Sequence, residues 1–277
     1  MKSNQHRIRC SALPSWPDCP RRTAAKTFRK LIERQGFKLR ELPPSIGAAV
    51  GTATHKVAEL VLQHKIDTGS LGAFDDGLEQ ALAGLSEEIS PGAVWDDTTP
   101  NLNTAQLQVK SLAKAYYSAV AAKVDPLAVE LSLEADAGGG FVLTGHIDLL
   151  TVQGWIRDLK TGSVERPYYQ QHGGYSLLVR SNNQNGVVNG LAVDWIKRVG
   201  KTKPQPAPVE KIYDVQTCER AALDVIGDIK RCVSDFESVG NPGIFVANPM
   251  SMMCSDKYCP AWGTDFCPLS TAGKGGE

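Results

Sequence analysis

The sequence predicts an α/β fold in which a group of helices precedes a mixed central sheet. Apolar residues recur at helical spacing through the first part of the 277-residue chain, whereas strand-like alternation begins only near residue 127. After three strands the pattern returns to a helix and then to a strand, and it ends in a long amphipathic helix. Helices are expected near 20–35, 52–65, 74–89 and 103–123, after Tyr168 and near 217–239; strands are expected near 127–135, 141–152, 155–160, 186–199 and 211–215.

The composition is that of a single globular domain. Apolar residues make up 42% of the chain and charged residues 22%, which is ordinary for one hydrophobic core. The expected parts are a helical N-terminal part over 1–125, a catalytic core over 126–240 and a cysteine-rich segment over 241–270. No apolar run approaches the roughly 20 residues needed to span a bilayer, so a membrane role is not expected.

The first expected helix carries an excess of positive charge. Eight basic residues stand from Arg21 to Arg40, against the single acid Glu33, although the net charge of the chain is zero. Such a cluster fits the phosphates of a nucleic acid, and it equally fits a solvated helix face. The candidates for DNA binding are Arg21, Arg22, Lys26 and Arg29.

The next helices differ in charge. His55 lies in the segment GTATHKVAEL, whose apolar side is formed by Val57, Leu60 and Val61. The stretch 66–109 contains no Lys or Arg and carries eight acidic residues. That stretch is therefore expected to face away from nucleic acid.

Glu130 and Glu134 lie in the first predicted strand. The apolar residues Val129, Leu131 and Leu133 alternate with them, which places both carboxylates on the opposite face. This alternation favours a solvated strand face. The alternative is that Glu130 adds a carboxylate to a metal site.

The following segment, GHIDLLTVQGWIRDLK, predicts a β-hairpin. Gln153 and Gly154 form a turn signal between two strand-like runs. In the second strand, the two-residue period places Asp158 and Lys160 on one face. Asp148, in the first strand, then needs only to face them.

These three side chains suit divalent-metal chemistry. Two carboxylates favour Mg²⁺ or Mn²⁺, which polarises a phosphodiester and lowers the pKa of a bound water. The ammonium of Lys160 can orient the attacking water, help to deprotonate it, or offset charge on the phosphoryl oxygens. The alternative is an ordinary surface ion pair between Asp158 and Lys160, with Asp148 capping a turn.

Two polar residues belong to the helix expected after Tyr168. A spacing of four places Gln171 and Tyr175 on one helical face. Gly173 and Gly174, between them, each disfavour a helix interior by roughly 1 kcal/mol relative to alanine. The helix is therefore expected to begin only near Gly174.

This set of residues resembles the PD-(D/E)XK nuclease superfamily and, within it, the RecB-like branch. Members of that branch carry GxxD, a turn and (D/E)xK followed by Thr-Gly, with a histidine on an upstream helix and QxxxY on a downstream helix. The matching residues are Gly145, Asp148, Asp158, Lys160, Thr161 and Gly162, with His55 upstream and Gln171 and Tyr175 downstream. Ile147 replaces the proline of the superfamily name, and Asp158 stands where many members have glutamate.

The resemblance implies a restriction-endonuclease-like αβββαβ core and a role for each residue. The side chains that would bind Mg²⁺ or Mn²⁺ are His55, Asp148 and Asp158. Those that would take part in catalysis are Lys160, Asp158, Asp148, Gln171 and Tyr175. The glutamine and the tyrosine would support the site or contact the nucleic-acid strand.

Cysteines gather near both ends of the chain. Cys254, Cys259 and Cys267 lie in a loop-rich segment, and Cys19 precedes a proline in SALPSWPDCPRR. Three cysteines this close together are typical of a thiolate-bound metal centre, which needs a fourth ligand. Cys10 competes with Cys19 for that position.

The same cysteines resemble those of RecB-like nucleases in which a 4Fe–4S cluster clasps the two chain ends together. The implied ligands are Cys19, Cys254, Cys259 and Cys267. Zinc is the alternative, although the spacing is looser than the CxxC pairs of zinc ribbons, and the absence of any metal is a third interpretation. Cys218 and Cys232 lie near the last helix and are expected to be core thiols.

The seven cysteines are not expected to form disulfides. Their number is odd, and no secretory signal is evident. The expected location is a reducing cytoplasm. If the protein is phage-encoded, this is the cytoplasm of the host cell.

The sequence therefore predicts a Mg²⁺- or Mn²⁺-dependent DNA nuclease, an exonuclease acting in recombination, repair or phage DNA processing. DNA is the expected partner, with recombination or repair proteins as further candidates and RNA as an alternative substrate. The other functions in view are a DNA-binding accessory subunit that has lost catalysis and a site-specific endonuclease. The sequence does not specify an oligomeric state.

Overall fold

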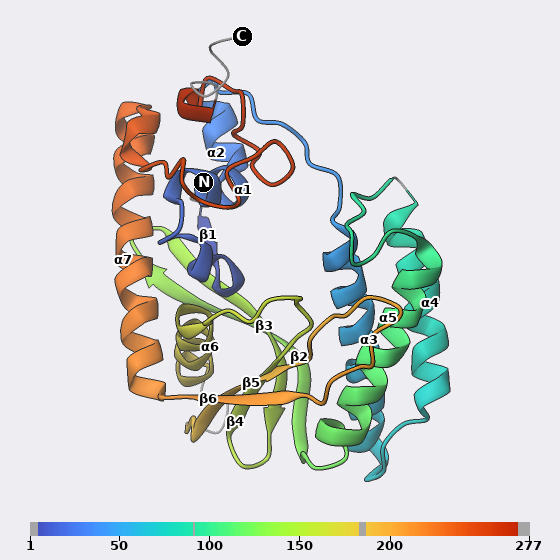
Figure 1. The fold of residues 1–277 in the computed structure, drawn as a ribbon. Coiled ribbons are helices and arrows are strands. Elements are labelled where there is room, and N and C mark those ends of the chain that lie inside the picture. Colours follow the sequence, from blue (N-terminus) through green and yellow to red (C-terminus); the bar gives the residue numbers. More distant parts are fainter. Residues whose placement is uncertain (1–4, 91, 183–186, 271–277) are drawn as a thin grey trace.

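A six-stranded mixed sheet forms the centre of the computed structural model, which describes residues 5–90, 92–182 and 187–270 (Figure 1). Its strands are β1 His6–Arg9, β2 Pro126–Gly138, β3 Phe141–Thr151, β4 Trp155–Lys160, β5 Gly190–Trp195 and β6 Val209–Tyr213. β2 is antiparallel to β3 and pairs with one of its edges. β1 and β4 pair with different segments of β3, and β1 is parallel to β3 whereas β4 is antiparallel to it. β5 is parallel to β4, and β6 is antiparallel to β5. Since β2 occupies one edge of β3, β1 and β4 share the other edge.

The shared edge of β3 is interrupted. β1 pairs with residues 141–144 and β4 with residues 149–150, so that residues 145–148 have no ladder partner on this edge in the described part of the chain. Asp148 lies in the gap, and its Oδ2 accepts a hydrogen bond from the backbone N–H of Leu159 at 2.7 Å. A polar side chain thus takes the place of a backbone ladder near the middle of the sheet.

Helices cover both faces of the sheet. The α-helices are α1 Pro20–Thr27, α2 Arg29–Arg34, α3 Ile46–Thr68, α4 Phe74–Ile89, α5 Leu102–Tyr116, α6 Tyr169–Ser181 and α7 Val215–Val239. α3, α4 and α5 lie on one side of the sheet, and α6 and α7 lie on the other (Figure 1). Among the residues that the structure describes, no helix has the length and apolar character to cross a membrane.

Two separate hydrophobic cores lie against the two faces. One is built from α3, α4 and α5 with Leu149 and Leu159 of the sheet. The other is built from β1, α1, α2, α6, α7 and the C-terminal segment, with Phe236, Phe245 and Phe266 among its fully buried side chains. Burying one such side chain contributes roughly 1.5–3 kcal/mol. The cores therefore hold α3 and α6 independently against opposite faces of the sheet.

Residues at the ends of the long helices satisfy the free backbone groups there. The side chains of Asn101 and Asp214 accept hydrogen bonds from the N–H groups of Thr104 at 2.9 Å and Thr217 at 2.7 Å. Gly240 ends α7 in the left-handed conformation, with φ of 68°. These caps fix where α5 and α7 begin and where α7 ends.

The predicted hairpin and the predicted order of strands and helices are confirmed. β1 is not predicted by the pattern, because four residues are too short for a periodic signal, and it lies in the part expected to be helical. The helix expected over 20–35 is divided at Phe28, whose φ of −113° and ψ of 31° are not helical. Of the strand expected over 186–199, Gly186 lies outside the described residues, and the strand in the described part spans 190–195.

The expectation that α6 begins only near Gly174 is wrong, because α6 begins at Tyr169. A Cβ on Gly173 would lie 1.9 Å from the carbonyl oxygen of Cys218, in α7, and a Cβ on Gly174 would lie 2.7 Å from the Sγ of Cys10. Both glycines are therefore required by close packing. The contact between α6 and its neighbours outweighs the roughly 1 kcal/mol cost of each glycine in a helix.

Replacing Gly173 with alanine is expected to lower the free energy of unfolding by about 3 kcal/mol, the upper end of the usual overpacking cost. The reason is that the clashing atom belongs to the backbone of α7, so α6 has to move. Urea denaturation measures the change. Gly227→Ala in α7 is the matched control, since no atom lies within 4 Å of its Cβ position. The control should stabilise the protein by about 0.5–1 kcal/mol, and equal effects of the two substitutions would contradict the packing explanation.

Candidate active site

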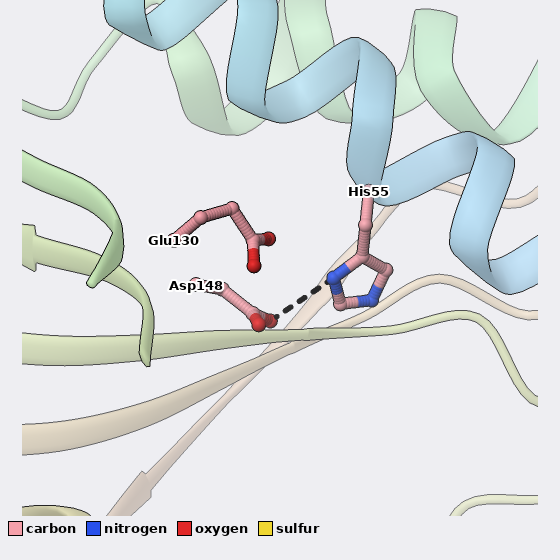
Figure 2. Close-up of side chains that lie close together, drawn as sticks. All are labelled: His55, Glu130 and Asp148. Carbon is pink, nitrogen blue, oxygen red and sulfur yellow. Dashed lines mark ion pairs between the residues drawn. The ribbon is translucent and has the colours of Figure 1, made fainter. Parts of the chain in front are cut away.

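Three side chains from three different elements converge next to the gap in the sheet. His55 from α3, Glu130 from β2 and Asp148 from β3 point toward one another (Figure 2). One ligand atom of each lies within 4.8 Å of the others, and His55 Nδ1 lies 3.4 Å from Asp148 Oδ2. Ligand atoms bound to Mg²⁺ at about 2.1 Å are at most about 4.2 Å apart, so a small closing movement would bring all three onto one cation. One imidazole nitrogen and two carboxylates suit Mg²⁺ or Mn²⁺.

Glu130 reaches this group through an unusual backbone conformation. Its φ of 46° lies in the left-handed region, which costs a residue with a side chain about 1–2 kcal/mol. Val129 and Leu131, on either side, keep their pairing with β3. The strain is therefore confined to one residue. The favoured expectation of a solvated face is wrong for Glu130, because its carboxylate lies beside Asp148.

A second group of polar side chains surrounds Asp158, which is only 1% exposed. Lys160 Nζ lies 2.6 Å from Asp158 Oδ2. The amide Nε2 of Gln171 donates to Asp158 Oδ1 at 3.0 Å and to Tyr175 Oη at 2.7 Å. Asp158 is thus held from both sides, and Gln171 links it to Tyr175.

The backbone joins the two groups. Leu159 stands between Asp158 and Lys160 in sequence, and its N–H is the donor to Asp148 Oδ2. Asp158 lies outside the set of ligand atoms that converge within 4.8 Å in the described ranges. Its two oxygens contact Lys160 and Gln171 instead.

The mutual attraction of these groups shifts their pKa values. Burial opposes the charge on His55, yet the carboxylate of Asp148 raises the pKa of His55 to about 9. Burial likewise opposes the charge of Asp148, but His55 and Lys160 hold the pKa of that carboxyl below its ordinary value. Burial raises the pKa of Glu130 to about 7 and, despite Lys160, that of Asp158 to about 6. The pKa of Lys160 is raised because Asp158 and Asp148 outweigh the effect of burial. At neutral pH, Lys160 is therefore an ammonium, and His55 carries a proton that a cation would have to displace.

Asp148 of the first group and all four members of the second group line one cavity of about 780 Å³. It is lined from the sheet by Ser132, Thr144 and His146, in addition to Asp148, Asp158 and Lys160, and from the helix α6 by Gln171 and Tyr175. A second cavity of about 520 Å³ is lined by His55 and Lys160. These volumes are within the usual range of ligand pockets.

Tyr168 is a neighbour of the site that the sequence pattern does not indicate. Its ring centroid lies 5.0 Å from Lys160 Nζ, a distance at which the aromatic face attracts an ammonium. Its position just before Gln171 is the only sequence signal that could have identified it. Tyr168 also lines the second cavity.

The four cysteines expected to bind a cluster line one small cavity. Its lining comes from the start of α1 and from the C-terminal segment, which lie together at one end of the molecule (Figure 1). The cysteines are Cys19, Cys254, Cys259 and Cys267. The N–H of Asn248 donates to Cys19 Sγ at 3.5 Å, and Arg21 Nη1 donates to Cys267 Sγ at 3.9 Å.

The sulfur positions are wider than those of a zinc site. Four thiolates bound tetrahedrally at 2.3 Å would lie about 3.8 Å apart. No three cysteine sulfurs in the described part of the chain come within 4.8 Å of one another. The alternative in which Cys10 is a ligand is wrong, because Cys10 is fully buried in the core below α6. Cys218 and Cys232 are core thiols, as predicted.

Two residues expected to bind DNA instead support the structure. Arg21 Nε donates to the carbonyl oxygen of Phe245 at 2.9 Å. Arg22 pairs with Asp18 at 2.7 Å and donates to Ser251 Oγ at 2.8 Å. Both arginines are buried, with 7% and 5% exposure. The expectation that they contact DNA is therefore wrong, because they hold the C-terminal segment against α1.

The other two basic candidates are more accessible. Arg29 pairs with Glu33 at 3.1 Å and donates to the carbonyl oxygen of Arg40 at 2.6 Å. Lys26 is exposed. A role of Lys26 and Arg29 in DNA binding stays a prediction.

Comparisons with known proteins identify the family and the fold of the chain. The model of the PD-(D/E)XK nuclease superfamily matches residues 10–267. A predicted exonuclease from Eubacterium rectale shares the fold with a TM-score of 0.56 and 11% sequence identity, covering 100% of this chain and 91% of that chain. LHK-Exo in complex with dAMP aligns with a TM-score of 0.32 and 10% identity, covering 70% of this chain and 96% of that chain. No curated protein matches the sequence.

Proposed function

The chain belongs to the PD-(D/E)XK nuclease superfamily, and on this basis we propose that it is a Mg²⁺- or Mn²⁺-dependent deoxyribonuclease that removes nucleotides from DNA ends. The observation that carries the proposal is the convergence of His55, Glu130 and Asp148 within 4.8 Å, next to the pair of Asp158 and Lys160. The exonuclease mode is supported by the RecB-like sequence of the hairpin. The fold shared with the predicted exonuclease from Eubacterium rectale is in line with it.

The first group would hold the cation. His55, Glu130 and Asp148 would supply one nitrogen and two carboxylate donors. Asp158 would add a further carboxylate if its contact with Lys160 or Gln171 were broken. Bound there, Mg²⁺ or Mn²⁺ would supply Lewis-acid polarisation of a phosphoryl oxygen and a water of lowered pKa.

The second group would orient the reactants. Lys160 is an ammonium with a raised pKa, so it is suited to orienting the attacking water and to stabilising negative charge on the phosphoryl oxygens rather than to accepting a proton. Gln171 fixes Asp158 through a hydrogen bond at 3.0 Å and is itself fixed by Tyr175. These two residues of α6 are therefore assigned a positioning role.

Digestion of end-labelled DNA tests the function. Wild-type protein is expected to degrade DNA with Mg²⁺ or Mn²⁺ and not with a chelator. Lys160→Ala should lower kcat by about 10²–10³, the usual effect of removing one group that stabilises transition-state charge. Lys110→Ala is the control, because Lys110 is exposed on α5. The proposal fails if neither metal supports digestion or if Lys160→Ala digests as fast as wild type.

The mode of attack is tested on DNA with and without ends. An exonuclease should degrade linear single- or double-stranded DNA and leave closed circular DNA of the same sequence intact. Cleavage of the closed circles would identify an endonuclease. A matched RNA strand in the same assay tests the choice of nucleic acid.

We further propose that Cys19, Cys254, Cys259 and Cys267 bind a 4Fe–4S cluster. The support is that all four line one cavity and that, among the described residues, no three cysteine sulfurs lie within 4.8 Å of one another, whereas the sulfurs around a zinc ion lie about 3.8 Å apart. The hydrogen bonds to Cys19 and Cys267 are of the kind that stabilises thiolate ligands.

Anaerobic purification tests the cluster. Visible absorbance with about four iron and four sulfide per chain is expected, and Cys259→Ser should lose most of both. Cys232→Ser, a change in a buried core thiol, is the matched control. Zinc as the sole bound metal would contradict the proposal, as would iron that remains in Cys259→Ser.

A further inference from the structure

A basic groove adjoins the active-site cavity. It is a cavity of about 670 Å³ between β1 and α2. Its basic lining residues are Arg7, Arg9, Arg29, Lys30 and Arg34. No Asp or Glu is among the described residues that line it. We call this cavity, with its five basic residues, the basic groove.

The basic groove is continuous with the active-site cavity, because Arg7 and Arg9 line both. β1 alternates so that Ile8 is buried in the core while Arg7 and Arg9 are exposed on its other face. Arg9 pairs in register with Thr144 of β3, four residues before Asp148. At about 3.3 Å per strand residue, the backbone of Arg9, the last residue of β1, lies roughly 13 Å from that of Asp148 along the strand direction. A strand of a few nucleotides spans this distance.

The positive charge of the groove is only partly compensated. Three of its members have acidic partners that do not line it: Arg7 with Glu134 at 2.6 Å, Arg29 with Glu33 at 3.1 Å and with Glu41 at 3.0 Å, and Arg34 with Glu237 at 3.9 Å. Glu134 lines the adjoining active-site cavity. Arg9 and Lys30 form no ion pair with any residue that the structure describes. Ion pairs at a surface contribute little stability, so a phosphate can replace a carboxylate as the partner of an arginine.

We propose that the basic groove binds the phosphate backbone of the DNA strand and leads it to the metal ligands. This inference rests on the proposed nuclease function. Arg9 and Lys30, which form no ion pair in the described part of the chain, can bind phosphates independently of base sequence, which suits an enzyme that degrades DNA from its ends. Near the metal ligands the cavity adds neutral donors, Ser11, Ser132 and Thr144, to the path.

Salt-dependent DNA binding tests the groove. The dissociation constant of the full chain for a fluorescent DNA oligonucleotide is measured in EDTA, to prevent cleavage, over a series of salt concentrations. The double variant R9Q/K30Q should flatten the slope of log K against log salt by about 1.8 for duplex and about 1.4 for single-stranded DNA, since each phosphate contact contributes about 0.9 or 0.7. With Mg²⁺ or Mn²⁺ present, KM should rise several-fold while kcat stays unchanged.

The control is K110Q/K203Q, which removes two exposed charges far from the groove. The proposed DNA-binding role of the groove is contradicted if R9Q/K30Q leaves the slope unchanged or if the control changes the slope equally. If the wild type cleaves DNA and R9Q/K30Q has an unchanged slope, DNA binding by the groove is contradicted and the nuclease function is still supported. A flattened slope in a protein that cleaves no DNA would support the groove and contradict the nuclease function.

Discussion

Replacing Asp148 with asparagine is expected to lower kcat/KM for DNA cleavage by about 10³-fold. The substitution preserves shape, and the asparagine oxygen can still accept the hydrogen bond from Leu159, so the hairpin and the stability of the fold should change little. What disappears is the negative charge that faces both His55 and the cation position. The pKa of His55, raised to about 9 chiefly by this carboxylate against the effect of burial, should fall toward its ordinary value.

Two measurements follow the effect of Asp148→Asn: the rate of DNA digestion and an NMR titration of the His55 ring. Asp224→Asn is the matched control, because Asp224 is exposed on α7. A variant that retains more than about a tenth of the wild-type rate, with an unchanged His55 titration, would show that Asp148 is not the centre of the site.

Binding of Mn²⁺ is expected to strengthen about tenfold per pH unit between pH 7 and 8.5, and about a hundredfold per unit between pH 6 and 7. The direction of this pH dependence follows from the protons that His55 and Glu130 carry before the metal binds. A cation binds only the deprotonated ligands, and His55, with a pKa of about 9, carries a proton throughout this range. Below pH 7, Glu130, with a pKa of about 7, carries a second proton. Each proton that must be displaced weakens binding tenfold per unit as the pH falls.

Isothermal titration of Mn²⁺ at several pH values measures this dependence. His55→Asn removes the group with the higher pKa and should reduce the dependence between pH 7 and 8.5, although binding becomes weaker overall. Glu130 keeps part of the dependence, because the loss of His55 raises its pKa. Wild-type affinity that does not change across this interval would show that His55 is not a ligand.

The sequence predicts those parts of the site that follow from local periodicity. The turn at Gln153 and Gly154 sets the hairpin, and alternation along β4 places Asp158 and Lys160 together, as their distance of 2.6 Å shows. Both results depend only on neighbours in the chain. The resemblance to a known superfamily added His55, Gln171 and Tyr175, which lie far from the hairpin in sequence.

The residues that the sequence does not predict depend on tertiary contacts. Glu130 lies beside His55 and Asp148 because its φ of 46° departs from the strand conformation that alternation assumes. The glycines of α6 are in a helix because α7 lies too close for a side chain. Arg21 and Arg22 are buried because the C-terminal segment packs over them. The number of basic residues along the sequence does not predict this tertiary contact.

The two separate hydrophobic cores have a consequence for how the protein would lose activity. His55 is carried by the helix layer on one face of the sheet, Gln171 by the layer on the other, and Asp148 by the strand between them. Local opening of one layer separates His55 from the strand, and local opening of the other separates Gln171 from it, while the opposite layer stays folded. The catalytic arrangement thus exists only while both layers are closed, and it is less stable than either core by itself. Amide exchange at the unpaired edge of β3 would report on both openings at once.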